Sequence, residues 1–142
     1  MKSEEAEKLI AEFEKGTLPK EKWTHHAHFV MALWYCYHLP LPVAVARIKD
    51  GIKQYNIAIG GVNTDDAGYH ETITLFYIYA INHYIVHAID KNNLDKLLAD
   101  LNVQPFVAKD FPLQFYSNEL LMSSRARKGW IHPDKFSFCF TL

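Results

Sequence analysis

The chain has little cysteine, little net charge and no segment rich in glycine or proline. Its two cysteines, Cys36 and Cys139, exclude a disulfide-rich scaffold. Fifteen lysines and arginines face sixteen aspartates and glutamates, so no positive field attracts a phosphate backbone, and we expect no nucleic-acid partner. A chain of 142 residues with 49% hydrophobic residues buries enough surface to fold without a disulfide or a structural metal. We therefore expect one globular domain over residues 1–142.

The chain also lacks a long apolar segment suited to a membrane. Residues 23–46 and 72–89 contain no Asp, Glu, Lys or Arg, and segments of about 20 apolar residues can span a bilayer. Both segments contain histidines, and the first contains Pro40 and Pro42, which makes them costly in lipid. We therefore expect two buried helices and no membrane partner. Residues 1–16 do not have the pattern of a signal peptide, and together with the two cysteines this predicts a cytoplasmic protein.

Motifs of several enzyme classes are absent as well. The sequence contains no G-x-G-x-x-G, G-x-x-x-x-G-K-[ST], G-x-S-x-G or C-x-x-C segment. Dinucleotide binding, P-loop phosphate binding, an α/β-hydrolase nucleophile and a dithiol redox site therefore have no support. His83 and His87 have the spacing of two zinc ligands, but the glutamate of an H-E-x-x-H motif is replaced by Tyr84.

Apolar residues recur at helical spacing along most of the chain. The segments with this period are 3–15, 24–38, 42–55, 69–89, 94–101 and 119–122. The sequence therefore predicts an all-α, compact bundle of about six helices, with the two charge-free segments at its centre. Residues 59–68 are expected to form a loop, and residues 136–140 an extended tail, because no second strand is present to pair with them.

Capping residues mark the expected helix ends. Thr24 and Ser117 are typical N-caps, and Gly16 is a typical C-cap. Gly68 is the expected N-cap of the long helix over 69–89, which would make Glu71 its third residue and part of a capping pair. Ser123 or Ser124 is the expected N-cap of one further helical turn. This turn would end with three basic residues, Arg125, Arg127 and Lys128, and Gly129 would follow it as the C-cap glycine.

Three segments in fixed order carry a resemblance to a known family. They are Thr24-His25-His26-Ala27-His28, Tyr69-His70-Glu71-Thr72-Ile73-Thr74 and Ala126-Arg127-Lys128-Gly129-Trp130-Ile131-His132-Pro133-Asp134. The chain resembles a family of small uncharacterised bacterial proteins with T-H-x-x-H, Y-H-E-T-[IL]-T and A-R-x-x-[WF]-[VI]-x-P-D segments. The resemblance covers residues 23–134 and implies no particular activity. The residues that it emphasises are His25, His28, His70, Glu71, Arg127, Trp130 and Asp134.

The spacing of the histidines predicts a site by a separate argument. His25 and His28 are three residues apart, so they share one face of a helix, and the small Ala32 further along that face leaves a depression. His70 and Glu71 stand at the start of the long helix, after a glycine-containing loop. If the two helix starts lie side by side, the three imidazoles converge, with Glu71 as a fourth ligand or a general base.

Our leading hypothesis is therefore a site for a small molecule or a divalent transition metal between the two central helices. The metal-ligand candidates are His25, His28, His70 and Glu71, and the outer ligand-binding candidates are Tyr35, Arg127 and Trp130. If the site is catalytic, His70 or Glu71 would transfer protons, or the metal would assist hydration or hydrolysis. Two alternatives remain open at this point. One is an interaction or structural module, including a homo-oligomer, whose histidines only stabilise helix ends, and the other is a helical pocket for heme or another tetrapyrrole.

Overall fold

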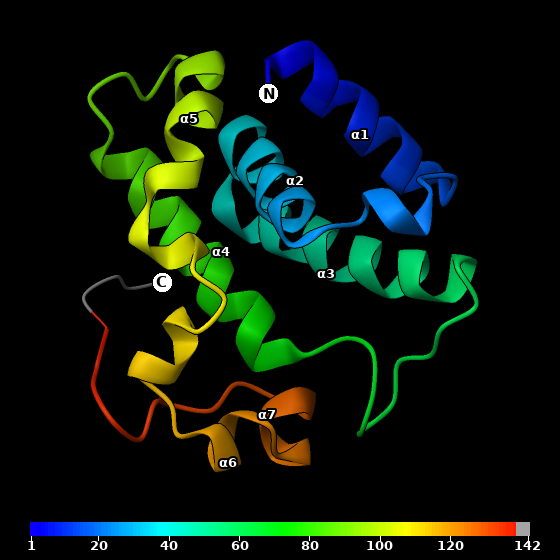
Figure 1. The fold of residues 1–142 in the computed structure, drawn as a ribbon, viewed down its shortest axis with the longest axis vertical. Helices are drawn as coiled ribbons and strands as arrows, with labels where there is room; N and C mark the ends of the chain where they lie inside the picture. Colours follow the sequence, from blue (N-terminus) through cyan, green and yellow to red (C-terminus); the bar gives the residue numbers. More distant parts are fainter. Residues whose placement is uncertain (139–142) are drawn as a thin grey trace.

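The computed structural model describes residues 1–138, and Figure 1 shows that helices make up most of this range. Its α-helices are α1 (Ser3–Lys15), α2 (His25–His38), α3 (Leu41–Ala58), α4 (Glu71–His87), α5 (Leu94–Asp100), α6 (Asn118–Leu121) and α7 (Ser124–Lys128). Its 3-10 turns are η1 (Lys20–Lys22), η2 (Leu101–Val103), η3 (Pro105–Val107) and η4 (Phe111–Gln114). Residues 1–138 contain no strand, so the predicted all-α class is confirmed. Residues 139 and 140 of the expected tail, Cys139 included, lie outside the described residues.

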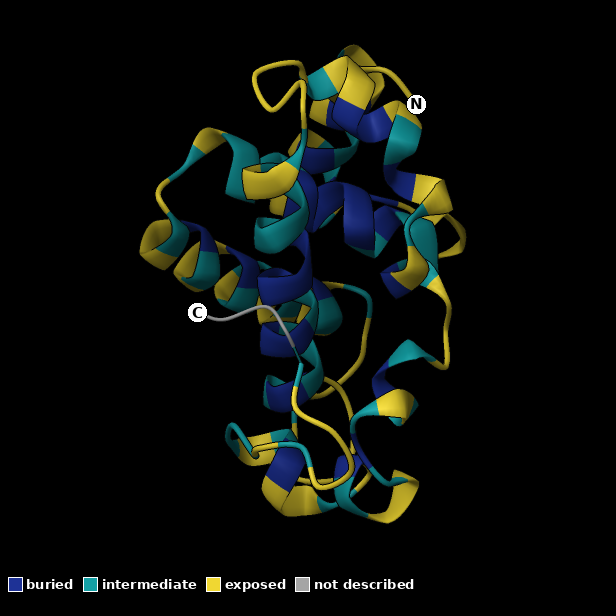
Figure 2. Ribbon diagram, turned by 90° about the vertical axis from the view of Figure 1, so that its left-hand side faces the viewer, coloured by how far each residue is buried: buried dark blue, intermediate teal, exposed yellow. Residues whose placement is uncertain are grey.

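The helix α2 lies at the centre of the bundle. It contacts α1, α3, α4 and α5, while α4 continues past it and packs with its other part against α7 (Figure 1). Figure 2 shows the buried residues gathered along these central helices and the exposed residues on the outer turns. The two charge-free segments of the sequence therefore form the centre, as expected. Within residues 1–138, no helix is both long and apolar enough to cross a membrane.

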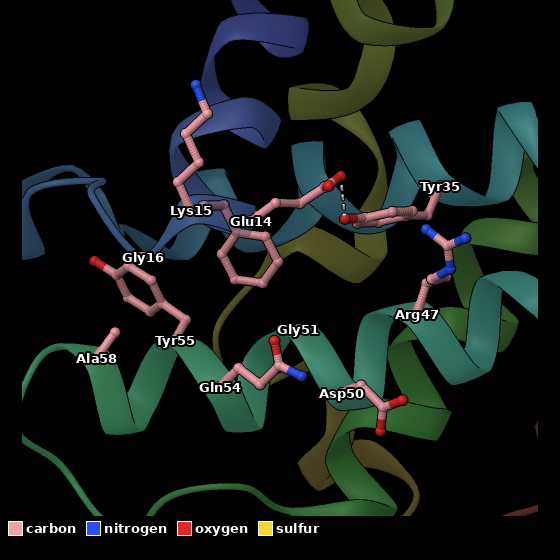
Figure 3. A pocket seen from close by; sticks show the side chains of 11 residues that line it. Glu14, Lys15, Gly16, Tyr35, Arg47, Asp50, Gly51, Gln54, Tyr55 and Ala58 are labelled. Carbon is pink, nitrogen blue, oxygen red and sulfur yellow. Dashed lines mark hydrogen bonds between the residues drawn. The ribbon is translucent and has the colours of Figure 1, made fainter.

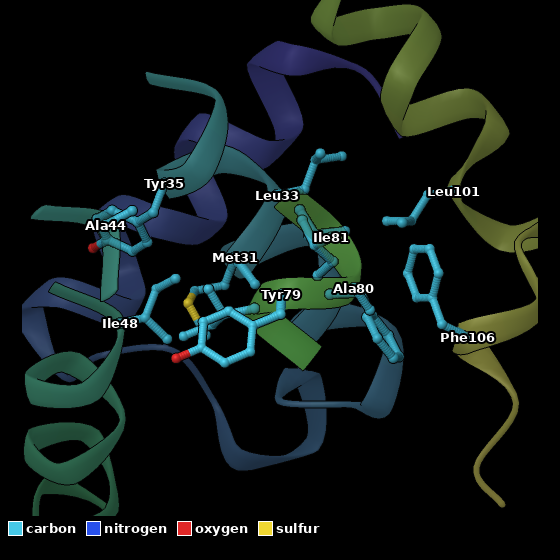
Figure 4. Packing of buried hydrophobic residues seen from close by; sticks show 14 of the residues in the cluster. Met31, Leu33, Tyr35, Ala44, Ile48, Tyr79, Ala80, Ile81, Leu101 and Phe106 are labelled. Atoms are coloured by element: carbon cyan, nitrogen blue, oxygen red, sulfur yellow. The ribbon is translucent and has the colours of Figure 1, made fainter. Parts of the chain in front are cut away.

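The core joins side chains from helices and turns that are far apart in the sequence. Figure 4 shows Met31 of α2 and Tyr79 of α4 close together, with Ile48 of α3 on one side and Leu101 and Phe106 on the other. All five side chains are buried. The 3-10 turns after α5 therefore cover the second side of the α2–α4 pair, although their sequence has no regular helical period.

A glycine inside α3 is explained by the packing of α1. A Cβ atom placed on Gly51 would lie 2.8 Å from the ring of Phe13, which is itself stacked on Trp23. Glycine within a helix costs about 0.5–1 kcal/mol relative to alanine, but here it allows the phenylalanine to approach the α3 backbone. The unfavourable local residue is therefore required by a contact between two helices.

The start of α4 differs from the prediction. The helix begins at Glu71 and ends at His87, and its N-cap is His70 in place of Gly68. The ring atom Nδ1 of His70 accepts a hydrogen bond of 3.1 Å from the backbone N–H of Ile73. Gly68 instead serves the loop, with a φ of 83° and no room for a Cβ atom beside the carbonyl oxygen of Val62. Glu71 is thus the first residue of the helix, and the predicted capping pair is wrong.

The other caps follow the sequence more closely. Thr24, Ser117 and Ser123 each accept a backbone hydrogen bond through the side-chain oxygen at the start of α2, α6 and α7. Gly16 ends α1 in the left-handed conformation that favours glycine. Gly129 follows α7 as predicted, but its backbone is extended. Its place after the helix therefore does not depend on a positive φ.

Candidate functional site

A central cavity of about 370 Å³ lies between α2, α3 and α4. Its lining residues are His25, His28, Phe29, Met31, Ala32, Ile48, Ile52, Ile73, Thr74, Tyr77, Ile78 and Ile81. At its inner end Met31, Ile48 and Ile81 are at most 1% exposed, whereas His25 and His28 are half-buried. The cavity therefore has an apolar interior and a polar end next to solvent. Two of the predicted site residues, and the depression expected at Ala32, belong to it.

Hydrogen bonds to the backbone fix which ring nitrogen of each cavity histidine carries the proton. Nε2 of His25 lies 2.8 Å from the carbonyl oxygen of Val107, and Nδ1 of His28 lies 2.7 Å from that of Thr24. A carbonyl oxygen only accepts, so in both cases the ring nitrogen is the donor. In the neutral form of each ring, Nδ1 of His25 and Nε2 of His28 then keep a lone pair. Each ring thus offers one hydrogen-bond acceptor.

The surroundings of His28 favour its neutral form. Burial lowers the pKa of His28, and a charge on the neighbouring His25 lowers it further, while the bond to the Thr24 carbonyl opposes this shift. The ring also lies against Trp23, with 3.8 Å between the ring centroids. At neutral pH His28 is therefore an uncharged acceptor at the polar end of the cavity.

Tyr77 adds a hydroxyl group to this end of the cavity. Its ring meets the rings of Phe29 and His25 edge-on, with centroid distances of 5.0 and 6.4 Å. Burial, aided by the charge of Asp110, raises the pKa of Tyr77 to about 12, so the hydroxyl keeps its proton at neutral pH. The same tyrosine, with His25 and Ile73, also lines a neighbouring cavity of about 270 Å³. The three side chains thus form a wall shared by two cavities.

His70 has a different environment from the two histidines of α2. It is 8% exposed, its Nδ1 atom caps α4, and its Nε2 atom donates a hydrogen bond of 2.7 Å to the carbonyl oxygen of Leu121. Both ring nitrogens are therefore occupied by protein partners. Burial lowers the pKa of His70 and so does the charge of Arg127, although the bond to Leu121 opposes the shift. The residue joins α4 to α6 as a neutral ring.

Glu71 is held in an ion pair instead of facing the imidazoles. One carboxylate oxygen lies 2.6 Å from Nζ of Lys49, and the other accepts a 2.6 Å hydrogen bond from the hydroxyl of Tyr69. Burial opposes ionisation of Glu71, but these two hydrogen bonds and the charge of Lys49 outweigh it and lower its pKa. Glu71 is thus a charged link between α3 and α4.

The residues of the C-terminal motif fasten the end of the chain to the start of α4. Thr72 is fully buried, and its hydroxyl donates to the carbonyl oxygen of Gly129 at 2.8 Å and accepts from the N–H of Ile131 at 3.2 Å. Arg127 donates a 2.7 Å hydrogen bond to the carbonyl oxygen of Gly68. The Y-H-E-T-I-T and A-R-K-G-W-I-H-P-D segments therefore bind each other.

Two further motif residues complete this attachment. Asp134 accepts hydrogen bonds of 2.7 and 2.6 Å from the backbone N–H and the hydroxyl of Ser117, the N-cap of α6. Trp130, an expected ligand-binding residue, is half-buried and packs against Tyr79 and Phe138 at centroid distances of 5.7 and 5.9 Å. Both residues have a structural role that is sufficient to explain them.

Tyr35 lies apart from the histidines as well. It lines a second cavity, of about 400 Å³, between α1, α2 and α3, where its hydroxyl donates a 2.8 Å hydrogen bond to Glu14 (Figure 3). The two cavities have no lining residue in common. The predicted site is thus divided between the central cavity, the second cavity and the contacts at the start of α4.

The residues present do not fit a metal ion shared by the four predicted ligands. Both nitrogens of His70 and both carboxylate oxygens of Glu71 already have protein partners. Over residues 1–138, no group of three or more histidine, cysteine, aspartate or glutamate side chains is placed to hold a metal. The geometry therefore does not support the predicted site with four ligands on one ion.

Comparison of the chain with protein-family models, curated proteins and solved structures finds no match. The resemblance to the family of small bacterial proteins therefore stays a prediction.

Several residues of the two cavities were missed by the sequence reasoning. Ile48 and Ile52 of α3 also line the central cavity. The site predicted from the sequence lay between the two charge-free helices and did not include α3. Arg47 and Asp50 line the second cavity, although their positions favour the solvent side of α3. Arg47 and Asp50 are three residues apart, so the sequence alone could have placed them on the same face of α3.

Proposed function

We propose that the protein binds a small, largely apolar molecule in the central cavity, with one polar group of that molecule at His25 and His28. The observation that carries this proposal is the cavity itself, whose volume of about 370 Å³ lies within the usual range of ligand pockets, about 300–1,000 Å³. A mostly apolar lining with a few polar groups at one end is also typical of such pockets. The apolar part of the ligand would lie against the buried side chains of Met31, Ile48 and Ile81.

The polar end of the cavity selects the chemistry of the ligand's polar group. His25 and His28 each offer a lone pair when neutral, and the environment of His28 disfavours a positive charge on its ring. A hydroxyl or N–H group on the ligand can donate to these nitrogens, whereas a carboxylate would face lone pairs. We therefore expect a neutral ligand with a hydrogen-bond donor.

Binding is tested with N-phenyl-1-naphthylamine, a neutral apolar probe with one N–H group whose fluorescence rises in an apolar site. We expect a saturable rise with the native protein at pH 7.5. Ala32→Leu, which fills the cavity from α2, should weaken binding of the probe about tenfold or more, because the added atoms occupy its volume. The matched control is Ala46→Leu on the exposed side of α3, which should bind as the native protein does.

Competition identifies the polar group. We expect 1-octanol to displace the probe at a lower concentration than octanoate, and His28→Leu to reduce this preference because it removes one acceptor. Absence of a saturable rise, or equal probe binding by Ala32→Leu and Ala46→Leu, would contradict the proposal. Equal competition by octanol and octanoate would contradict the assignment of a neutral donor group.

A further inference from the structure

The second cavity combines an aromatic floor with charged edges. Its floor is formed by the rings of Phe13, Tyr35 and Tyr55, which are all buried, and by the backbone of Gly51. Tyr55 is fixed there by a 2.8 Å hydrogen bond from its hydroxyl to the carbonyl oxygen of Leu18. The floor is therefore an apolar layer of closely packed rings that border the cavity.

The edges of this cavity carry both signs of charge in equal number. Its charged lining residues are Glu14, Lys15, Arg47 and Asp50, and Gln54 adds an amide. Within residues 1–138, the side chains of Arg47, Asp50 and Gln54 make no hydrogen bond or ion pair, and only Glu14 is bonded, to Tyr35. Neither a simple cation nor a simple anion matches a lining with two acids and two bases.

Two of the charged side chains lie beside Tyr35. In Figure 3, Glu14 of α1 and Arg47 of α3 both point toward Tyr35, while Asp50 and Gln54 extend from the next turns of α3. Burial raises the pKa of Tyr35, as do its hydrogen bond to Glu14 and the charge of Glu14, and the charge of Arg47 opposes them. A carboxylate of α1 and a guanidinium of α3 thus lie beside the same tyrosine, and the carboxylate is bonded to its hydroxyl.

We propose that this cavity binds a free amino acid with an aromatic side chain. Arg47 takes the carboxylate of the ligand through two parallel N–H groups, the geometry that guanidinium and carboxylate share. Glu14 accepts from the ligand's ammonium group through the carboxylate oxygen that Tyr35 leaves available, and Asp50 adds a second negative charge. The ring of the ligand lies in the cavity and covers the parts of Phe13, Tyr35 and Tyr55 that border it. This site is independent of the one proposed for the central cavity.

The test is calorimetric titration with L-phenylalanine, phenethylamine and 3-phenylpropionate, of which the last two each lack one of the charges. We expect each analogue to bind about tenfold or more weakly than L-phenylalanine, since each loses one charge-assisted contact. Arg47→Gln should weaken L-phenylalanine and 3-phenylpropionate by about tenfold and leave phenethylamine unchanged. Glu14→Gln, which keeps an acceptor for the Tyr35 hydroxyl, should weaken L-phenylalanine and phenethylamine and leave 3-phenylpropionate unchanged.

The matched control is Arg125→Gln, which removes an exposed arginine of α7 and should bind all three compounds as the native protein does. Circular dichroism and thermal unfolding of every variant establish that it is folded. The proposal is overturned if L-phenylalanine gives no binding at millimolar concentration, if the three compounds bind equally, or if Arg125→Gln weakens binding as much as Arg47→Gln. Arg47→Gln should bind N-phenyl-1-naphthylamine as the native protein does, because Arg47 does not line the central cavity. This measurement distinguishes a failure of the amino-acid site from a failure of the proposed function.

Discussion

Replacement of His70 measures how much the attachment at the start of α4 stabilises the fold. Its ring caps the helix through Ile73 and donates to the buried carbonyl of Leu121. Loss of an N-cap costs about 0.5–2 kcal/mol, and an unpaired buried carbonyl costs about 1–3 kcal/mol. We therefore expect His70→Ala to lower the free energy of unfolding by about 2–4 kcal/mol. His70→Asn keeps a side chain that caps helices, so its loss should be about half as large.

The same residue predicts a dependence on pH. Its pKa in the folded protein is below the ordinary value of 6.5, so the unfolded chain binds a proton more readily than the folded protein. The stabilisation by neutral His70 is therefore complete above about pH 6.5 and is lost as the pH falls from there through the lowered pKa of the folded state. The stability gap between the native protein and His70→Asn should shrink over this interval.

Urea unfolding followed by circular dichroism at pH 7.5, 6.5 and 5.0 measures both effects. The matched control is His132→Asn, at an exposed position of the same C-terminal motif, which should leave the free energy of unfolding almost unchanged. The reasoning is refuted if His70→Ala unfolds within about 0.5 kcal/mol of the native protein, the usual range of surface substitutions. A gap between native protein and His70→Asn that stays constant or widens in acid would refute the assigned protonation.

Three further variants test other contacts. Thr72→Val leaves two backbone groups of the C-terminal motif unpaired and should lower the free energy of unfolding by about 2 kcal/mol or more, whereas Thr72→Ser should cost less than about 1 kcal/mol in the same urea assay. Gly51→Ala should destabilise the protein by about 1 kcal/mol in thermal or urea unfolding despite the better helix propensity of alanine, because its Cβ would press on Phe13. Burial raises the pKa of Cys36 to about 12, so in a Cys139→Ser background iodoacetamide at pH 8 should alkylate the folded protein about tenfold or more slowly than the urea-unfolded one. A stable Gly51→Ala variant, equal costs for both Thr72 variants, or equal alkylation rates would each contradict the corresponding contact.

The fold was largely predictable because its main signals are local. The charge-free segments 23–46 and 72–89 form the central helices, and Thr24 and Gly16 cap helices where the sequence expects them. The start of α4 was predicted wrongly because a histidine is an unusual N-cap, and the usual signal, Gly68, is required by the loop instead. The correct cap depends on the position of the ring, which residue type alone does not indicate.

The candidate site was only partly predictable, since its partners are distant in sequence. The spacing of His25, His28 and Ala32 predicts that they share one helix face, and all three line the central cavity. The position of His70 and Glu71 at a helix start suggested that they bind a ligand. In the structure His70 contacts α6 and Glu71 contacts α3, and the sequence alone does not show these contacts. Their motif therefore describes a structural link between distant segments.

The most direct test of the central claim is the position of the bound probe. Isotope-filtered NOE spectra of protein labelled at the isoleucine methyl groups, with N-phenyl-1-naphthylamine bound, report which methyl groups contact it. We predict NOEs from the probe to Ile48, Ile78 and Ile81, which are buried in the lining of the central cavity. NOEs confined to the exposed Ile57 and Ile89 would contradict a binding site between α2, α3 and α4.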